Sequence, residues 1–275
     1  MAVLAVVSGN GSPGATTSTV ALATCWPADV LVADCDPGGG DIALGWCHRQ
    51  LLGRELDLDA GVASFVEATR RGHPATAAGL APHLQTPAQA PHVDLLVAVR
   101  TWQDGSQVDE MGWQQLAVAL SDITRRPTAA GSAGRDVLVD CGRLGPFTPW
   151  PVLESADLVL AAARPGPRQV LLACRALEEL AGRIAPSRLA VLACATDPAA
   201  TSKLIEARGV LPAAELPRDR LGAALLLGES RRSWRRFERT KLGRAAHRAA
   251  RRLHRRLHTR YADPAHVGLA SRGVG

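Results

Sequence analysis

The chain has 275 residues, of which 47% are hydrophobic and 21% charged, a balance typical of a globular protein and not of a disordered one. No run of 18 apolar residues occurs, so no membrane-spanning helix is predicted. The first apolar stretch has no basic segment before it and leads into glycines, which favours a cytoplasmic protein without a signal peptide. Six scattered cysteines form no C-x-x-C pair, and Cys35, Cys141 and Cys194, in or beside predicted strands, are expected to be free core residues, with metal or disulfide use as the alternative.

The net charge of +6 hides a strong asymmetry along the chain. Residues 231–260 hold twelve arginines and Lys241 against the single acid Glu238, so this segment carries +12. The remaining 245 residues therefore sum to −6. We expect an acidic body with a basic C-terminal arm, whose partners would be polyanions.

The first element in chain order is an apolar strand at 3–7, followed at once by Gly9, Gly11 and Gly14 and by a short helix at 16–25. A strand, a glycine-rich turn and a helix N-terminus together form a typical phosphate-binding loop, because backbone N–H groups face the anion. Alternatively, the glycines only make a tight turn between the strand and the helix.

The spacing of this turn matches the phosphate-loop motif G-x-x-x-x-G-K-[ST] at every fixed position except one. Thr16 stands at the hydroxyl position, but Ala15 stands where the motif has its lysine. The sequence therefore predicts a phosphate loop that lacks its phosphate-binding cation.

Further strands and helices alternate along the rest of the chain. Strands are predicted at 30–33, 93–99, 137–139, 158–162, 189–194 and 210–215, and helices at 61–71, 109–124, 167–183, 199–208 and 219–227. In the helix at 109–124, Met111 is expected on the buried side with Leu116, Leu120 and Ile123. Residues 72–92 are predicted to be an irregular surface connection, and 126–135 a flexible loop. This order predicts an α/β fold with an open, mostly parallel sheet and helices on both faces.

Acidic residues follow two of the predicted strands. Asp34 and Asp36 come after the strand at 30–33, and Asp140 comes after the strand at 137–139. Such acids could be helix caps or surface acids at strand ends. The eight histidines show no ligand spacing, and we expect them to be solvated.

The motifs resemble those of the ParA/MinD family of P-loop ATPases over about residues 2–258. Residues 8–17 align without a gap to the family's S-G-K-G-G-V-G-K-T-T, and residues 30–39 are similar to its V-L-L-V-D-x-D-P-Q-G. Residues 137–142 resemble its second switch, and the segments at 156–165 and 217–219 resemble two later family motifs. The resemblance implies a ParA/MinD-like fold with Mg-ATP as cofactor.

The resemblance also implies roles for single residues. Thr16 would ligate Mg²⁺, Thr17 would bind the α-phosphate, Asp36 would position the attacking water, and Asp34 and Asp140 would support the metal and its waters. The implied nucleotide-binding residues are Gly9, Asn10, Gly11, Ser12, Gly14, Ala15, Thr16, Thr17, Pro217 and Asp219.

Both lysines that the family uses on the phosphates are replaced here, by Ala15 and Asn10. A hydrogen bond to a charged partner contributes roughly 1.5–3 kcal/mol, so each loss should weaken triphosphate binding about 10- to 150-fold. We therefore expect a pseudo-ATPase that acts as a scaffold in partitioning, septum placement or secretion-system positioning. The alternative is a working ATPase in which Arg143 or Arg164 replaces the lysines.

The basic arm has apolar residues at three- and four-residue steps from Trp234 to Tyr261, which predicts amphipathic helices that pack on, or extend from, a P-loop domain at 1–230. A loose tail is expected at 262–275. The candidate basic surface comprises Arg231, Arg232, Arg235, Arg236, Arg248, Arg251, Arg252, Arg255 and Arg256.

This surface could bind DNA phosphates without sequence preference, or anionic lipid headgroups. The protein would then associate with the nucleoid or with a membrane. A third hypothesis for the function of the chain is a DNA-binding module in which the sheet only supports the basic arm. The resemblance also implies a homodimer, or a heterodimer with an active ParA/MinD relative.

Overall fold

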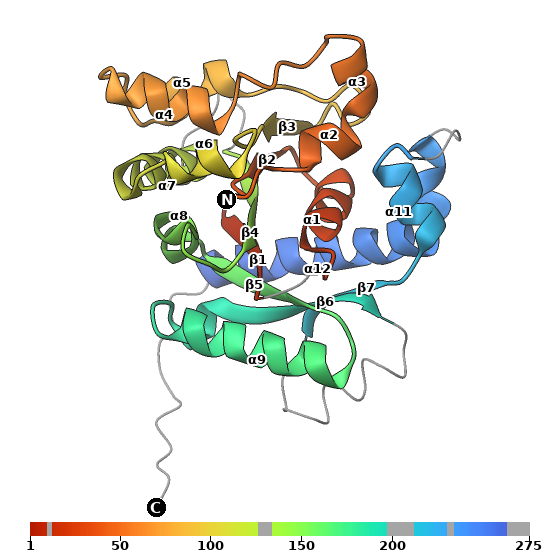
Figure 1. Cartoon of the computed structure of the whole chain (residues 1–275). Coiled ribbons are helices and arrows are strands. Elements are labelled where there is room, and N and C mark those ends of the chain that lie inside the picture. The colour runs from red at the N-terminus through yellow and green to blue at the C-terminus, as the bar shows by residue number, and fades with distance from the viewer. Residues whose placement is uncertain (10–12, 126–133, 197–211, 230–233, 263–275) are drawn as a thin grey trace, which may run out of the picture.

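The computed structural model describes residues 1–9, 13–125, 134–196, 212–229 and 234–262. Seven strands form one sheet in the order β3-β2-β4-β1-β5-β6-β7, and every neighbouring pair is parallel (Figure 1). The strands are β1 (Val3–Ser8), β2 (Val30–Asp34), β3 (Val93–Leu96), β4 (Asp136–Arg143), β5 (Leu158–Ala163), β6 (Leu189–Thr196) and β7 (Pro212–Pro217). The predicted α/β fold with a parallel sheet is confirmed.

Helices connect the strands and cover both faces of the sheet. They are α1 (Ala15–Thr24), α2 (Ile42–Trp46), α3 (His48–Leu52), α4 (Val62–Arg70), α5 (Ala77–Leu80), α6 (Trp102–Ser106), α7 (Glu110–Arg125), α8 (Trp150–Ser155), α9 (Pro167–Ala181), α11 (Arg220–Leu226) and α12 (Lys241–Ala262). Short 3₁₀ turns lie at η1 (Ala81–His83), η2 (Pro186–Arg188) and η3 (Trp234–Arg239).

The sheet is buried on both faces because its strands are continuously apolar. In β1, Leu4 and Val6 pack into the core on the side of α1 and α12, whereas Val3, Ala5 and Val7 pack on the side of α4, α7 and α8. Successive side chains of a strand point to opposite faces, so an unbroken apolar run fills both cores.

The basic arm packs against the sheet through its apolar stripe. Phe237, Leu242, Ala246 and Leu253 are each at most 5% exposed and belong to the core on the α1 side. Figure 1 shows α12 running along this side of the sheet behind α1. The arginines that the structure describes on α12 lie on its outer faces.

Several expectations for single segments need correction. Met111 is 58% exposed at the start of α7, where the apolar stripe begins one position later, with Gly112 and Trp113 buried. Residues 72–92 are not wholly irregular, since α5 and η1 lie there and Leu80 is fully buried. Strand β4 continues beyond the predicted 137–139, so Asp140 lies inside a strand and pairs in register with Asp34.

Other expectations fall partly or wholly outside the described residues. These are the helix at 199–208, most of the loop at 126–135, and nearly all of the tail at 262–275. Within the described part of the chain the cysteines are free, and five of the six are buried, among them the predicted core residues Cys35, Cys141 and Cys194. None of the helices described is long and apolar enough to cross a membrane.

Candidate nucleotide and magnesium site

The glycine-rich turn lies at the carboxyl edge of the sheet, between the end of β1 at Ser8 and the start of α1 at Ala15. Gly14 has φ +98°, a left-handed conformation that favours glycine. At Gly9, a Cβ would meet Ala176 Cβ of α9 at 2.6 Å, so close packing also requires glycine there. The predicted residues Asn10, Gly11 and Ser12 lie outside the described residues.

Thr16 and Asp140 are in direct contact, because the Thr16 hydroxyl hydrogen-bonds to the Asp140 carboxylate. The N–H of Gly142 donates to Asp140 Oδ1 at 3.0 Å, but Oδ2 is buried and has no hydrogen-bond partner in the described structure. Burial raises the pKa of Asp140 to about 6, although both hydrogen bonds act in the opposite direction. A buried carboxylate oxygen without a donor needs a compensating cation or water.

Asp34 and Asp36 lie at the same edge of the sheet as Asp140, and these three residues are here called the acidic edge. Asp34 is buried and accepts the N–H of Ile42 at 3.2 Å, and burial, followed by the charge of Asp140, raises its pKa well above the usual range. Burial also raises the pKa of Asp36, which accepts the N–H of Gly38 at 2.8 Å. Three carboxylates with raised pKa values at one edge fit a divalent cation, which favours their charged forms.

Asp36 lies directly against the backbone of β4. A Cβ on Gly142, whose φ is +62°, would fall 2.2 Å from Asp36 Cγ. Only glycine therefore allows the carboxylate of Asp36 to approach the strand that carries Asp140. The structure thus gathers the acids that the sequence places after two separate strands.

These residues fit Mg²⁺, which prefers carboxylate, hydroxyl and water oxygens. The Thr16 hydroxyl and Asp140 Oδ2 would hold the ion or its waters, with Asp34 on the neighbouring strand in register with Asp140. When bound, the ion would neutralise charge on the phosphates of a nucleotide.

A cavity of about 830 Å³ opens beside the loop, between the N-terminus of α1 and the carboxyl ends of β6 and β7. Its walls include Gly14 and Thr17 from the loop side, and Pro217 and Asp219 from the end of β7. A cavity of this size is within the usual range for a small-molecule site.

Asp219 also has a structural task in this wall. Its carboxylate accepts the N–H of Gly222 at 2.9 Å and that of Leu242 at 3.0 Å, which caps α11 and fixes the start of α12. Burial acts to raise the pKa of Asp219, but these N–H donors lower it below its usual value.

The cations of the site come from outside the loop. The side chain of Ala15 is buried in the core, so nothing replaces the loop lysine at that position. Arg164, at the end of β5, lines the cavity, and its Nε–H donates to the carbonyl oxygen of Pro13 at 3.0 Å. Arg143 is exposed, and its charge acts to lower the pKa of Asp36.

Three further cations on the cavity wall, Arg218, Arg220 and Lys241, were not foreseen as site residues. Arg218 lies inside the Pro-Arg-Asp segment that resembles a family motif, which was the one available signal. Lys241 counts in the sequence only as part of the basic arm, and the packing of α12 against β7 brings it to the cavity.

Solved structures of other proteins share the fold over nearly the whole chain. A ParA family ATPase from Chlorobium tepidum superposes with a TM-score of 0.69 at 15% identity, over 90% of this chain and 98% of that one. The cell division ATPase MinD of Pyrococcus furiosus gives 0.68 at 16% identity, over 92% and 98%. The fold is that of the ParA/MinD ATPases.

A third structure of this fold was determined with a nucleotide analogue. It is a plasmid partition protein of Borrelia burgdorferi bound to AMPPNP, with a TM-score of 0.64 at 11% identity, over 94% of this chain and 99% of that one. No protein-family model matches the sequence, and no curated protein matches it.

Proposed function

We propose that this chain is a ParA/MinD-like protein of spatial organisation, in partitioning, septum placement or secretion-system positioning, that binds a magnesium nucleotide weakly and hydrolyses it negligibly. One observation carries the proposal: the Thr16 hydroxyl hydrogen-bonds to Asp140, whose Oδ2 is buried without a partner among the described residues, and the next residue, Thr17, lines an 830 Å³ cavity. The nucleotide-bound partition protein of the same fold adds support.

The weakness of binding and hydrolysis follows from the missing lysines. Phosphoryl transfer depends on positioning and on neutralising charge at the γ-phosphate. Removing one such stabiliser costs on the order of 10²–10³ in rate. With Ala15 buried and Asn10 in place of a second lysine, the three carboxylates would hold the metal, but no lysine of the loop would hold the phosphates.

The test is calorimetric titration of the whole chain with ATP, with and without Mg²⁺, together with a phosphate-release assay. We expect magnesium-dependent binding that Thr16→Val removes, and no turnover above background. Ser121→Val, on the exterior helix α7, is the matched control and should bind as the unchanged chain does. Absence of binding, binding that ignores Mg²⁺, or turnover equal to that of an intact family ATPase would contradict the proposal.

A second candidate function, a working ATPase, is favoured by the position of Arg164. Its guanidinium is anchored on the loop carbonyl of Pro13 and lies on the cavity wall. If it replaces the lysine, Arg164→Ala should abolish turnover. The same substitution at Arg168, in the first turn of α9 and off the cavity wall, should leave turnover unchanged.

The outer face of α12 is the proposed partner surface. Arg248, Arg251, Arg252 and Arg255 are exposed there, while the opposite face of the helix is buried. We propose that this face binds DNA phosphates without sequence preference, because its alanine-rich apolar side is already packed against the sheet.

We also propose dimerisation, with a second copy or with an active relative that supplies the missing lysine. Analytical ultracentrifugation with and without Mg-ATP tests this assembly, and a monomer under both conditions would exclude a homodimer.

A further inference from the structure

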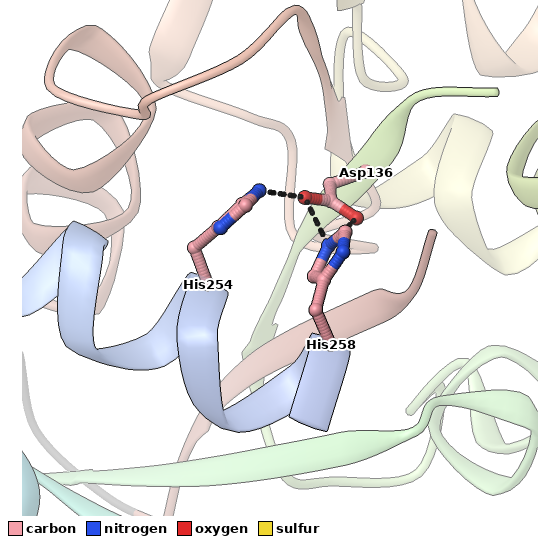
Figure 2. Close-up of side chains that lie close together, drawn as sticks. All are labelled: Asp136, His254 and His258. Carbon is pink, nitrogen blue, oxygen red and sulfur yellow. Dashed lines mark hydrogen bonds and ion pairs between the residues drawn. The ribbon is translucent and has the colours of Figure 1, made fainter. Parts of the chain in front are cut away.

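Two histidines of the basic arm and a buried aspartate form a cluster at the amino end of the sheet (Figure 2). His258 Nε2 lies 3.1 Å from each carboxylate oxygen of Asp136, and His254 Nε2 lies 3.5 Å from Oδ2. The potential ligand atoms of the three residues all lie within 4.8 Å of one another. The expectation that every histidine is solvated and without ligand spacing is therefore wrong for this pair.

The cluster lies apart from the nucleotide edge. Asp136 begins β4 and Asp140 lies four residues further along it, so the two carboxylates are separated by roughly 13 Å of strand. His254 and His258 are four residues apart on α12, which places both imidazoles on one face of that helix.

The carboxylate of Asp136 is held in a fixed orientation by groups outside the cluster. The N–H of Ala2 donates to Oδ1 at 2.9 Å, and the indole N–H of Trp26 donates to Oδ2 at 3.0 Å. Asp136 is 1% exposed, and Trp26 also makes an edge contact with the ring of His254. Such outer partners orient metal ligands in known sites.

The two imidazole rings are stacked on each other. They stack with 4.1 Å between ring centroids and 21° between planes, a separation at which two imidazolium charges repel. A neutral imidazole offers a nitrogen lone pair to a metal ion.

The spacing of the ligand atoms fits zinc. Bonds of 2.0–2.1 Å in a tetrahedral shell place neighbouring ligand atoms about 3.3 Å apart. The nitrogen-to-oxygen distances here, 3.1 and 3.5 Å, span that value. Two imidazoles and one carboxylate favour zinc over Mg²⁺ or Ca²⁺, which prefer oxygen ligands throughout.

The side chains of His254 and His258 are 25% and 31% exposed, so an ion and a water can reach them from solvent. We propose that Asp136, His254 and His258 bind one Zn²⁺ ion, with water as the fourth ligand, and that the ion fastens α12 to the start of β4. On binding, each Nε2 gives its lone pair to the metal and the imidazole proton resides on Nδ1. The proposal does not depend on nucleotide binding.

The experiment uses the whole chain, stripped of metal with EDTA and desalted. Titration with Zn²⁺ against a chromophoric chelator should show one tight equivalent and a higher melting temperature. Co²⁺ as a probe should give the intense visible bands of a four-coordinate site. Mg²⁺ should compete with neither ion.

The ligand variants are His254→Gln and His258→Gln, which keep a side chain able to donate to Asp136. Since loss of an outer partner alone weakens metal sites 10- to 100-fold, we expect each variant to lose at least about 100-fold in Zn²⁺ affinity. His247→Gln, exposed on the same helix, is the matched control and should bind Zn²⁺ normally. Circular dichroism of the metal-free variants verifies that they are folded.

Failure of the unchanged chain to bind one equivalent of Zn²⁺ would overturn the proposal. Equal Zn²⁺ binding by the folded double variant His254→Gln/His258→Gln would overturn it as well. Asp140→Asn should retain the Zn²⁺ site, so failure of the nucleotide proposal is distinguishable from failure of this one.

Discussion

The two ends of strand β4 each carry a buried carboxylate, but the two carboxylates differ in their hydrogen-bond partners. At the amino end, Asp136 receives the backbone N–H of Ala2 and the indole N–H of Trp26, and both oxygens face His258. At the carboxyl end, Asp140 Oδ2 has no hydrogen-bond partner in the described structure.

The two carboxylates are equally buried, so burial alone does not account for the difference. Asp136 is built into the fold, because it joins Ala2 near the N-terminus, Trp26 after α1, and α12 to the sheet. Asp140 carries an uncompensated acceptor at the edge where the glycine-rich loop begins α1. We infer that the first contributes to stability, whereas the second lowers stability in favour of binding.

The largest effect is expected from Asp136→Ala. Removing this carboxylate leaves buried N–H donors of Ala2 and Trp26 without an acceptor, which should destabilise the chain by about 3–5 kcal/mol. Chemical denaturation of the metal-free chain measures it. The exposed Asp59→Ala is the control, with an expected change within about 0.5 kcal/mol. If Asp136→Ala and Asp59→Ala changed the free energy of unfolding equally, Asp136 would not contribute to stability as inferred.

Asp140→Asn should act in the opposite direction. The folded-state pKa of about 6 lies above the unfolded value near 3.9, so the native state binds the extra proton and loses stability as pH rises from about 4 to 6. At pH 7.5 without Mg²⁺, the variant should be more stable by up to about 3 kcal/mol. At pH 4 the difference should vanish, and denaturation at both pH values measures it.

The same variant should lose magnesium-dependent nucleotide binding. If the variant gained no stability at pH 7.5, or still bound Mg-ATP as the unchanged chain does, Asp140 would not be a cation ligand.

Ala15→Lys combined with Asn10→Lys should restore the phosphate cations. Each lysine contributes roughly 1.5–3 kcal/mol to triphosphate binding, so we expect affinity to rise about 10- to 150-fold per lysine. Calorimetric titration with Mg-ATP measures it. The matched control places one lysine at Ser106, an exposed position at the end of α6. No gain from the double variant would mean that the remaining site does not accept phosphates.

The smallest effect on the fold is expected from charge reversal on α12. Replacing Arg248 and Arg255 by glutamate removes exposed cations, so stability should change by no more than about 0.5 kcal/mol each. Binding to a duplex DNA should weaken, and its dependence on salt should fall by about 0.9 in log–log slope per lost phosphate contact. Unchanged salt dependence would place any DNA contact on another surface.

The sequence predicted those parts of the molecule that depend on short-range patterns. Continuous apolar runs such as Val30 to Ala33 fix a strand buried on both faces. The glycines before Ala15 fix a turn into a helix, and the alternation of strands and helices fixes the parallel sheet. Asp34 and Asp36 were placed at the carboxyl end of β2 for the same reason. Met111 was wrongly predicted to be buried, because the apolar periodicity of a helix does not indicate at which residue of the first turn the buried face begins.

The tertiary structure alone decided which distant residues meet. His258 and Asp136 are 122 positions apart, and Lys241 reaches the cavity because α12 packs across β7. Charge and periodicity along the chain identify the basic arm, but they do not indicate which histidines turn inward, because that depends on the rotation of α12 against the sheet. Likewise, the missing donor at Asp140 is a property of its three-dimensional surroundings, since a carboxylate is satisfied or left unpartnered only by the groups that folding brings to it.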